Sequence, residues 1–317
     1  MPHLTEHPSK KVFIFLNTDK HASPFDILKL IDIFPEAQIL KYENITVEDA
    51  EKIVYDSMFP RGPKGAKHTK IFIGGSNFET INKILEKAKK CMFPPFELAV
   101  IVDPNGAYTT ASAAVAKTLE ISLKKKLGNL EGKNVTILAG TGPVGKTAAT
   151  LYAMEKAKVT LTSRNSERAA AVAAAVNKKF KTEIVKGLKA ETREEIGNAI
   201  KNAEIILSTG AAGVQLLPLK ILEEYGERCR IVADVNAIPP LGVEGLDVNA
   251  DGSELLPNIF GIGALTIGTL KNKVEKELFR KAAKASKGIF DYKIAYKIAK
   301  SLVKPETEWW TPTIPNP

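Results

Sequence analysis

Residues 133–154 read KNVTILAGTGPVGKTAATLYAM, and this stretch decides the fold of the second half of the chain. The apolar, β-branched run 133–139 predicts a strand, and the alanine-rich run 146–154 predicts a helix. Between them the three glycines form a Gly-x-Gly-x-x-Gly turn. Gly140 permits a tight turn, Gly142 lets a phosphate approach bare backbone, and Gly145 lets the helix pack close to the strand. The free N–H groups at the helix start favour phosphate binding.

A glycine pattern alone is a weak signal, because any tightly packed turn produces it. Here a second β-branched run, 158–162, follows the helix. The strand, helix and strand together complete a βαβ unit of about the ~30 residues expected of one. The stretch therefore predicts a dinucleotide-binding unit, with these residues at the phosphates: Gly140, Thr141, Gly142, Pro143, Val144 and Gly145.

The bulk composition is that of an ordinary globular protein. The chain has 317 residues, 44% hydrophobic and 26% charged, which suits two domains. We expect no signal peptide and no membrane helix, because the chain lacks the necessary apolar runs. Two isolated cysteines, Cys91 and Cys229, indicate a reducing, cytoplasmic location, and the four histidines show no metal-binding spacing. The net charge of +9 lies mostly on helix lysines, so it favours anionic small ligands over nucleic acid.

The first hundred residues predict a separate α/β unit. Apolar runs at 11–16, 37–42, 70–73 and 97–102 alternate with helical patterns, which indicates a parallel sheet. Ligands of such sheets bind beyond the carboxyl ends of the strands. That rule singles out the segments Asn17–Asp19, Gly74–Gly75 and Asp103–Gly106.

The overall prediction is an α/β protein with two domains. Residues 1–127 form a smaller α/β substrate domain that ends in a helix at about 109–127. Residues 128–286 form a Rossmann-type dinucleotide-binding domain, with a further strand at 182–185 and a long helix at 269–286. Residues 287–317 comprise a helix at 291–302 and a Trp309-Trp310 tail, which we expect to return to the first domain.

The end of the strand 158–162 bears on the choice of cofactor. An acidic residue about 20 positions after the glycines commonly binds the ribose hydroxyls of NAD. Here the chain instead reads Ser163, Arg164 and Asn165. A guanidinium group at Arg164 suits a 2′-phosphate, with Ser163 and Asn165 as additional hydrogen-bonding groups. We therefore expect NADP, with NAD also accepted because no carboxylate repels or selects it.

Several segments together resemble the bacterial NAD(P)-dependent methylene-tetrahydromethanopterin dehydrogenases. The resemblance covers roughly residues 11–301, in the same order and spacing. It is carried by these segments: Thr18-Asp19, Phe25-Asp26, Asp103 to Thr110, Leu138 to Gly145, Ala233 to Gly242 and Gly263 to Lys271. One local departure is Thr269, where the family commonly has a glycine.

The resemblance implies oxidation of 5,10-methylene-tetrahydromethanopterin to the methenyl form with NADP or NAD, in one-carbon metabolism. It implies a pterin in a cleft between the domains and a homo-oligomer, a trimer or hexamer. The active-site lysine of the family falls on Lys271, and the arginine that binds the 2′-phosphate falls on Arg164. Asp19, Asp103 and Asn105 become candidate substrate-binding residues, and Asn236 a candidate for the nicotinamide pocket. Turn and cap chemistry is a competing explanation for Asp19, Asp103 and Asn105, and a rigid turn is the competing explanation for Asn236.

The reaction so implied needs little acid–base chemistry. Hydride loss from a methylene group between two nitrogens leaves a cation that those nitrogens stabilise, and no proton leaves the carbon. The protein must align the two reactants in a dry site. Because a cation beside a developing cation is unfavourable, we expect Lys271 to position the substrate or to have a lowered pKa. An ordinary surface lysine is the alternative.

Two other function classes stay open. A methylene-tetrahydrofolate dehydrogenase shares this organisation, but the Tyr-x-x-x-Lys pair of the cyclohydrolases is absent at both Tyr42 and Tyr108. A shikimate-type dehydrogenase is a related possibility. A non-catalytic NAD(P) sensor would need the glycine turn but not Lys271.

Overall fold

The structure is a computed structural model, and it describes residues 10–303. These residues divide into two compact units. Unit 1 comprises 10–109 and 273–298, and unit 2 comprises 110–272 and 299–303. The boundaries therefore fall near the start of one long helix and inside another, whereas the sequence-based division used 127/128 and 286/287. The Trp309-Trp310 tail lies outside the described residues.

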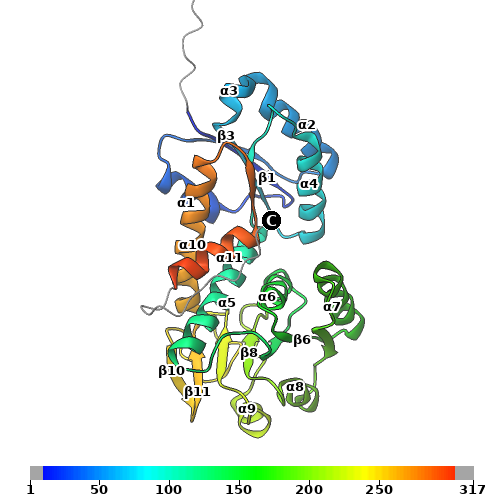
Figure 1. The fold of residues 1–317 in the computed structure, drawn as a ribbon, viewed down its shortest axis with the longest axis vertical. Helices are drawn as coiled ribbons and strands as arrows, with labels where there is room; N and C mark the ends of the chain where they lie inside the picture. Colours follow the sequence, from blue (N-terminus) through cyan, green and yellow to red (C-terminus); the bar gives the residue numbers. More distant parts are fainter. Residues whose placement is uncertain (1–9, 304–317) are drawn as a thin grey trace, which may run out of the picture. The chain divides into compact units, whose positions relative to one another are not determined.

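Unit 1 is built on a five-stranded, all-parallel sheet in the order β12-β4-β3-β1-β2. Two neighbouring strands of this sheet, β1 and β3, can be found in Figure 1. Its strands are β1 (Val12–Asn17), β2 (Gln38–Tyr42), β3 (Thr69–Gly74), β4 (Ala99–Val102) and β12 (Gly288–Phe290). Its helical elements are α1 (Pro24–Ile33), α2 (Val47–Met58), η1 (Phe59–Arg61), α3 (Gly62–Ala66), α4 (Phe78–Cys91) and η2 (Pro104–Gly106). Every residue of β3 and β4 is buried, which explains their continuous apolar runs.

Unit 2 is built on a seven-stranded sheet in the order β10-β11-β9-β8-β5-β6-β7. Its strands are β5 (Asn134–Leu138), β6 (Lys158–Ser163), β7 (Val185–Lys189), β8 (Ile205–Ser208), β9 (Ile231–Asp234), β10 (Asp251–Leu256) and β11 (Ile259–Ile262). Only β10 runs antiparallel to its neighbour. Read from β7 to β11, the strands follow the 3-2-1-4-5-6 order of a dinucleotide-binding fold. The predicted α/β class with a Rossmann-type sheet is confirmed.

The remaining helices are α5 (Ala107–Lys124), α6 (Pro143–Met154), α7 (Ser166–Phe180), α8 (Arg193–Ile200), α9 (Leu219–Tyr225), α10 (Ala264–Lys284) and α11 (Tyr292–Leu302). Most of α5 belongs to unit 2, where the Tyr152 hydroxyl donates to Thr118 Oγ1 at 3.1 Å and Lys117 pairs with Asp251 at 2.8 Å. The second part of α10 belongs to unit 1, where Phe279 contacts the Phe72 ring and Glu275 pairs with Lys29 at 2.7 Å.

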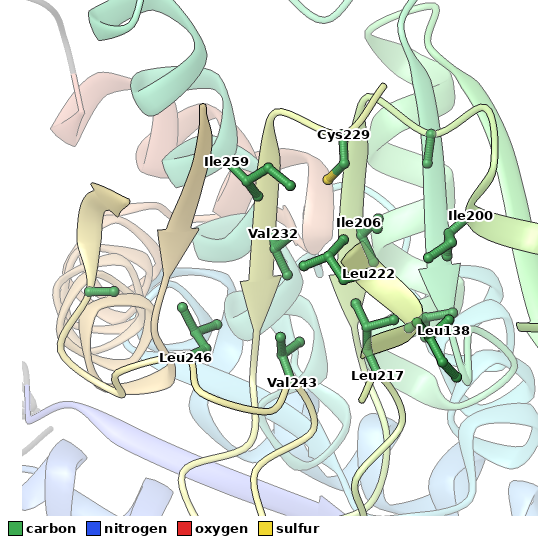
Figure 2. Packing of buried hydrophobic residues seen from close by; sticks show 13 residues of the cluster. Leu138, Ile200, Ile206, Leu217, Leu222, Cys229, Val232, Val243, Leu246 and Ile259 are labelled. Atoms are coloured by element: carbon green, nitrogen blue, oxygen red, sulfur yellow. The ribbon is translucent and has the colours of Figure 1, made fainter. Parts of the chain in front are cut away.

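One face of the unit 2 sheet is covered by an apolar core (Figure 2). Leu138, Ile206 and Val232, from β5, β8 and β9, pack with Leu222 of α9. The thiol of Cys229 lies among these side chains, and burial raises its pKa to about 12. The core holds the carboxyl ends of β5 and β8 in register, with Leu138 opposite Ser208.

Candidate functional site

The glycine turn between β5 and α6 has the geometry that phosphate binding requires. A Cβ atom on Gly145 would lie 2.5 Å from the Gly140 Cα, so only glycine lets α6 pack this close to the turn. Gly142 is the N-cap of α6 and has no side-chain cap, and a Cβ there would meet nothing within 4 Å. The turn is tied to β6, since the Gly140 N–H donates to the Thr162 carbonyl at 2.8 Å. The helix start therefore presents open backbone donors.

A pocket of about 480 Å³ opens beside this turn. Segments that follow the carboxyl ends of β5, β6, β7 and β8 build most of its wall. It is lined by Leu138, Ala139, Thr141, Thr162, Ser163, Arg164, Asn165, Arg168, Ala190, Ile196, Gly210, Ala211, Val214 and Leu216. Strands β5 and β8 flank the point where the strand order reverses, which is where open α/β sheets bind their ligands.

Sequence reasoning placed Thr141, Ser163, Arg164 and Asn165 together, and all four line this pocket. Asn165 also has a structural duty, because its side-chain oxygen accepts the Arg168 N–H at 2.7 Å and caps α7. Arg168 was not anticipated. It lies in the first turn of α7, four residues after Arg164, and nothing in the sequence distinguishes it from an ordinary helix arginine.

Asn236 lies outside the pocket lining and is nearly buried. Its amide donates to the Pro240 carbonyl at 3.2 Å, and its oxygen accepts the Ile238 N–H at 2.9 Å. These bonds close the loop after β9, in which the Pro239-Pro240 peptide bond is cis. Asn236 therefore shapes this loop from within.

Asp234, at the end of β9, holds the same loop. Its carboxylate accepts the N–H groups of Asn236 and Val243, each at 3.1 Å. Burial raises the pKa of this carboxyl, while these hydrogen bonds act in the opposite direction. The neighbouring Gly242 carbonyl accepts the Leu216 N–H at 2.8 Å, so the loop also supports the pocket wall.

In unit 1 the candidate residues lie at the carboxyl edge of three adjacent strands. The register aligns Leu16 with Ile73 and Ile73 with Val102, which brings the following loops together. Asp19 joins two of these loops, because its Oδ1 accepts the Ser76 N–H at 2.9 Å and the Ser76 hydroxyl at 2.7 Å.

Asp103 and Asn105 lie on the third loop and differ in exposure. Asp103 is buried, and its carboxylate accepts the Tyr108 N–H at 2.8 Å and the Thr109 hydroxyl at 2.6 Å. It thus stabilises the start of α5, the cap chemistry considered above. Asn105 is exposed and adopts a left-handed conformation with φ of 45°. Its side chain is therefore presented at the surface between buried neighbours.

Lys271 lies in α10, within unit 2. The expected helix start at Thr269 is wrong, because α10 already begins at Ala264 and Gly268 is an internal helical residue. Lys271 is consequently about two turns into the helix. Gly268 lies three residues before Lys271, so the two positions share one face of the helix. A Cβ on Gly268 would meet nothing within 4 Å, so the surface of the helix is open at this glycine.

Across 10–303 no group of three or more His, Cys, Asp or Glu side chains is placed to hold a metal ion. In the same range no helix combines the length and the apolar character needed to cross a membrane.

Comparisons with known proteins agree on one family. Residues 24–105 match the family model described as methylene-tetrahydromethanopterin dehydrogenase, N-terminal. The NAD(P)-dependent methylenetetrahydromethanopterin dehydrogenase of Methylorubrum extorquens is 35% identical over 296 residues, covering 92% of this chain and 98% of the relative. The bifunctional protein MdtA of the same organism is 36% identical, covering 93% and 99%.

Solved structures show a more distant likeness. The quinate dehydrogenase of Corynebacterium glutamicum in complex with NAD covers 92% of this chain and 99% of its own at 12% identity, with a TM-score of 0.49. The two Methylorubrum relatives match nearly end to end at more than a third identity. The chain therefore belongs to the methylene-tetrahydromethanopterin dehydrogenase family.

Proposed function

We propose that this protein oxidises 5,10-methylene-tetrahydromethanopterin to the methenyl form by hydride transfer to NADP or NAD. The observation that carries the proposal is the open glycine turn beside a pocket at the reversal point of a 3-2-1-4-5-6 sheet, in a chain of this family. The curated relative is named for this activity.

The pocket fits a dinucleotide. Gly142 leaves bare backbone at the start of α6, where N–H groups and the helix dipole favour a pyrophosphate. Leu138, Ile196 and Leu216 supply apolar wall for a base. The nicotinamide of the bound cofactor supplies the hydride acceptor. Arg164 on the pocket lining favours a 2′-phosphate, and no carboxylate lines the pocket to repel that phosphate.

We assign substrate binding to Asp19 and Asn105. Asp103 stabilises the loop that carries Asn105. The Oδ1 atom of Asp19 is engaged by Ser76, and its second oxygen remains to accept hydrogen bonds from an aminopyrimidine edge. Asp103 anchors the start of α5 and so fixes the loop that presents Asn105. Asp19 and Asn105 would therefore contact the substrate, and Asp103 would position Asn105.

Lys271 is proposed as the positioning residue of the reaction. The methylene carbon would lose a hydride and its two nitrogens would share the resulting charge, so no protein base is required. A cation near the developing charge slows the step unless it binds the substrate elsewhere or is neutral. Lys271 therefore serves orientation, through a hydrogen bond to the substrate beside the open turn at Gly268.

Assembly and location form part of the same proposal. We propose a homo-oligomer, a trimer or hexamer, in the cytoplasm. Cys91 and Cys229 are both buried free thiols, as expected for a reducing compartment. Light scattering coupled to size-exclusion chromatography measures the subunit number, and a monomer at micromolar concentration contradicts the assembly.

The decisive experiment is an anaerobic assay of NAD(P)H absorbance. Methylene-tetrahydromethanopterin and methylene-tetrahydrofolate are each supplied with NADP and with NAD. We expect reduction with the methanopterin substrate and a higher kcat/KM for NADP. Activity restricted to the folate substrate identifies the alternative dehydrogenase, and no reduction with any pair refutes the enzymatic proposal.

Lys271→Ala separates an enzyme from a sensor. The enzymatic proposal predicts a large loss of turnover with NADP affinity retained. Lys276→Ala is the matched control, because Lys276 is an exposed lysine on the same helix. Equal turnover in wild type and Lys271→Ala removes Lys271 from the mechanism.

A further inference from the structure

Two arginines, not one, face the pocket beside β6. Arg164 precedes α7 and Arg168 lies in its first turn, and both line the cavity. Within residues 10–303 neither guanidinium group has an ion pair or a side-chain hydrogen bond. Other arginines are engaged: Arg61 donates to Thr69, and Arg280 pairs with Glu277. The two pocket arginines thus keep their donors available for a ligand.

The pocket has no acidic counterpart to these charges. None of its lining residues is Asp or Glu. The acids nearest in sequence to the lining residues Ala190 and Ile196 are held elsewhere. Lys189 lies 3.5 Å from Glu191 and 3.3 Å from Glu195, and Glu195 also accepts the Thr192 N–H at the start of α8. The cavity therefore attracts anions.

Neighbouring polar groups fix the geometry of the pair. The Asn165 side chain caps α7 by accepting the Arg168 N–H at 2.7 Å, which anchors the backbone of Arg168. Ser163 Oγ accepts the Asn165 N–H at 3.2 Å, so its own hydrogen remains for donation. Two guanidinium groups and a hydroxyl donor around one cavity match a phosphomonoester, which offers three acceptor oxygens.

We propose that Arg168 is a second specificity-determining residue, which binds the 2′-phosphate of the adenosine ribose together with Arg164. This inference rests on the proposed function only in taking the cavity as the site of the adenosine half of the cofactor. The 2′-phosphate is shared by two guanidinium groups, and NAD, which lacks this phosphate, does not use them. Arg168 therefore sets the preference for NADP over NAD without being needed for NAD.

Calorimetric binding of two nucleotides tests the assignment on the full chain. Adenosine 2′,5′-bisphosphate carries the 2′-phosphate, and 5′-AMP lacks it. Arg168→Ala should weaken the bisphosphate about tenfold, as expected for loss of one exposed charge-assisted contact, and change 5′-AMP affinity less than about twofold. Lys178→Ala is the control, because it removes one charge from an exposed site near the end of the same helix.

A double-mutant cycle with Arg164→Ala measures the coupling between the two arginines in bisphosphate affinity, and a purely structural role of Arg168 would not produce such coupling. If both arginines bind one phosphate, the double variant loses a different factor in bisphosphate affinity from the product of the single losses. Raising the salt concentration should reduce the bisphosphate advantage of wild type more than that of Arg168→Ala. Equal behaviour of Arg168→Ala and Lys178→Ala, or equal loss of both nucleotides, overturns the proposal.

The outcome is distinguishable from failure of the proposed function. Arg168→Ala should lower the ratio of kcat/KM for NADP to kcat/KM for NAD about tenfold, whereas Lys178→Ala should leave this ratio unchanged. The wild-type protein could discriminate the two nucleotides through Arg168 and yet reduce neither cofactor with either substrate. That result would support the phosphate site and refute the dehydrogenase proposal.

Discussion

Gly145→Ala and Gly142→Ala form a pair of substitutions with opposite expected effects. The added methyl group at position 145 would lie 2.5 Å from the Gly140 Cα and 2.6 Å from the Gly140 carbonyl oxygen, against 3.4–4 Å for ordinary contact. These atoms are backbone, so the start of α6 must move away from the turn. At position 142 the methyl group meets nothing within 4 Å.

Two opposing contributions determine whether Gly145→Ala raises or lowers the free energy of unfolding. Alanine gains up to about 1 kcal/mol of helix propensity over glycine, whereas overpacking of a close contact costs about 1–3 kcal/mol. A rigid backbone contact belongs at the upper end, so we expect a net loss of about 1–2 kcal/mol. For a unit of this size that lowers Tm by roughly 2–8 °C.

Gly142→Ala should leave the melting temperature near that of wild type. The loss of a favourable N-cap residue and the reduced entropy of the unfolded chain are each worth about 1 kcal/mol or less, and they oppose each other. Its effect should appear in binding, because the methyl group occupies the space that the pyrophosphate needs.

Thermal unfolding followed by circular dichroism, without nucleotide, and calorimetric titration with NADP separate the two effects. Gly145→Ala should melt earlier, and Gly142→Ala should melt normally but bind NADP at least about tenfold more weakly. A Gly142→Ala protein that melts as early as Gly145→Ala, or a Gly145→Ala protein with wild-type stability, refutes this account of the turn.

Three further substitutions test other parts of the structure. Gly242→Ala places a methyl group against the Ser208 hydroxyl and the Asp234 carboxylate, so it should lower Tm and weaken NADP binding through Leu216; normal binding would disconnect the loop from the pocket. Burial lowers the pKa of Lys70 from 10.5 to about 8, so between these pH values the unfolded chain binds a proton that the folded chain has released. The Tm of wild type should therefore rise relative to that of Lys70→Met as the pH increases from about 8 to about 10.5, and parallel profiles of Tm against pH would show that Lys70 does not titrate there. Gly268→Ala should raise the stability of α10 by about 0.5–1 kcal/mol while lowering kcat/KM for the methylene substrate, and unchanged kinetics would show that the open turn is not used.

The βαβ unit around the glycine turn could be predicted because its signals are local. Val135, Ile137 and Leu138 are buried in β5, and the glycines mark the turn within a few residues of their observed place. Strand β7 was misplaced, since 182–185 was expected and Val185–Lys189 observed. Gly187 reads as a loop residue, but it is needed there because a Cβ would collide with the Ala169 backbone.

Strands β10 and β12 were not foreseen, because distant pairing creates them. Asp251–Leu256 lacks an alternating apolar pattern and becomes a strand by pairing with β11. Gly288–Phe290 is too short to show periodicity and is fixed by β4, with Gly288 opposite Ala99. Propensity measured along a short window cannot report such contacts.

The candidate site divides in the same way. Arg164 could be predicted because the number of residues between it and the glycine turn can be read from the sequence. Arg168 sits inside a helix, where an arginine is ordinary, and only the cavity gives it a ligand-facing environment. Asp103 was ambiguous, since a carboxylate before a helix serves equally as a cap or as a ligand until its burial is known.

The position of β12 has a consequence for biosynthesis. Unit 1 draws one edge of its sheet from residues 288–290, although its other strands are all complete by residue 102. Residues 110–272, which form nearly all of unit 2, emerge from the ribosome in between. During translation β4 therefore waits with one edge unpaired while the nucleotide-binding unit is already free to fold. Residues 273–298, which complete the first unit, are made only after residues 110–272, so maturation of the first unit depends on prior synthesis of most of the second.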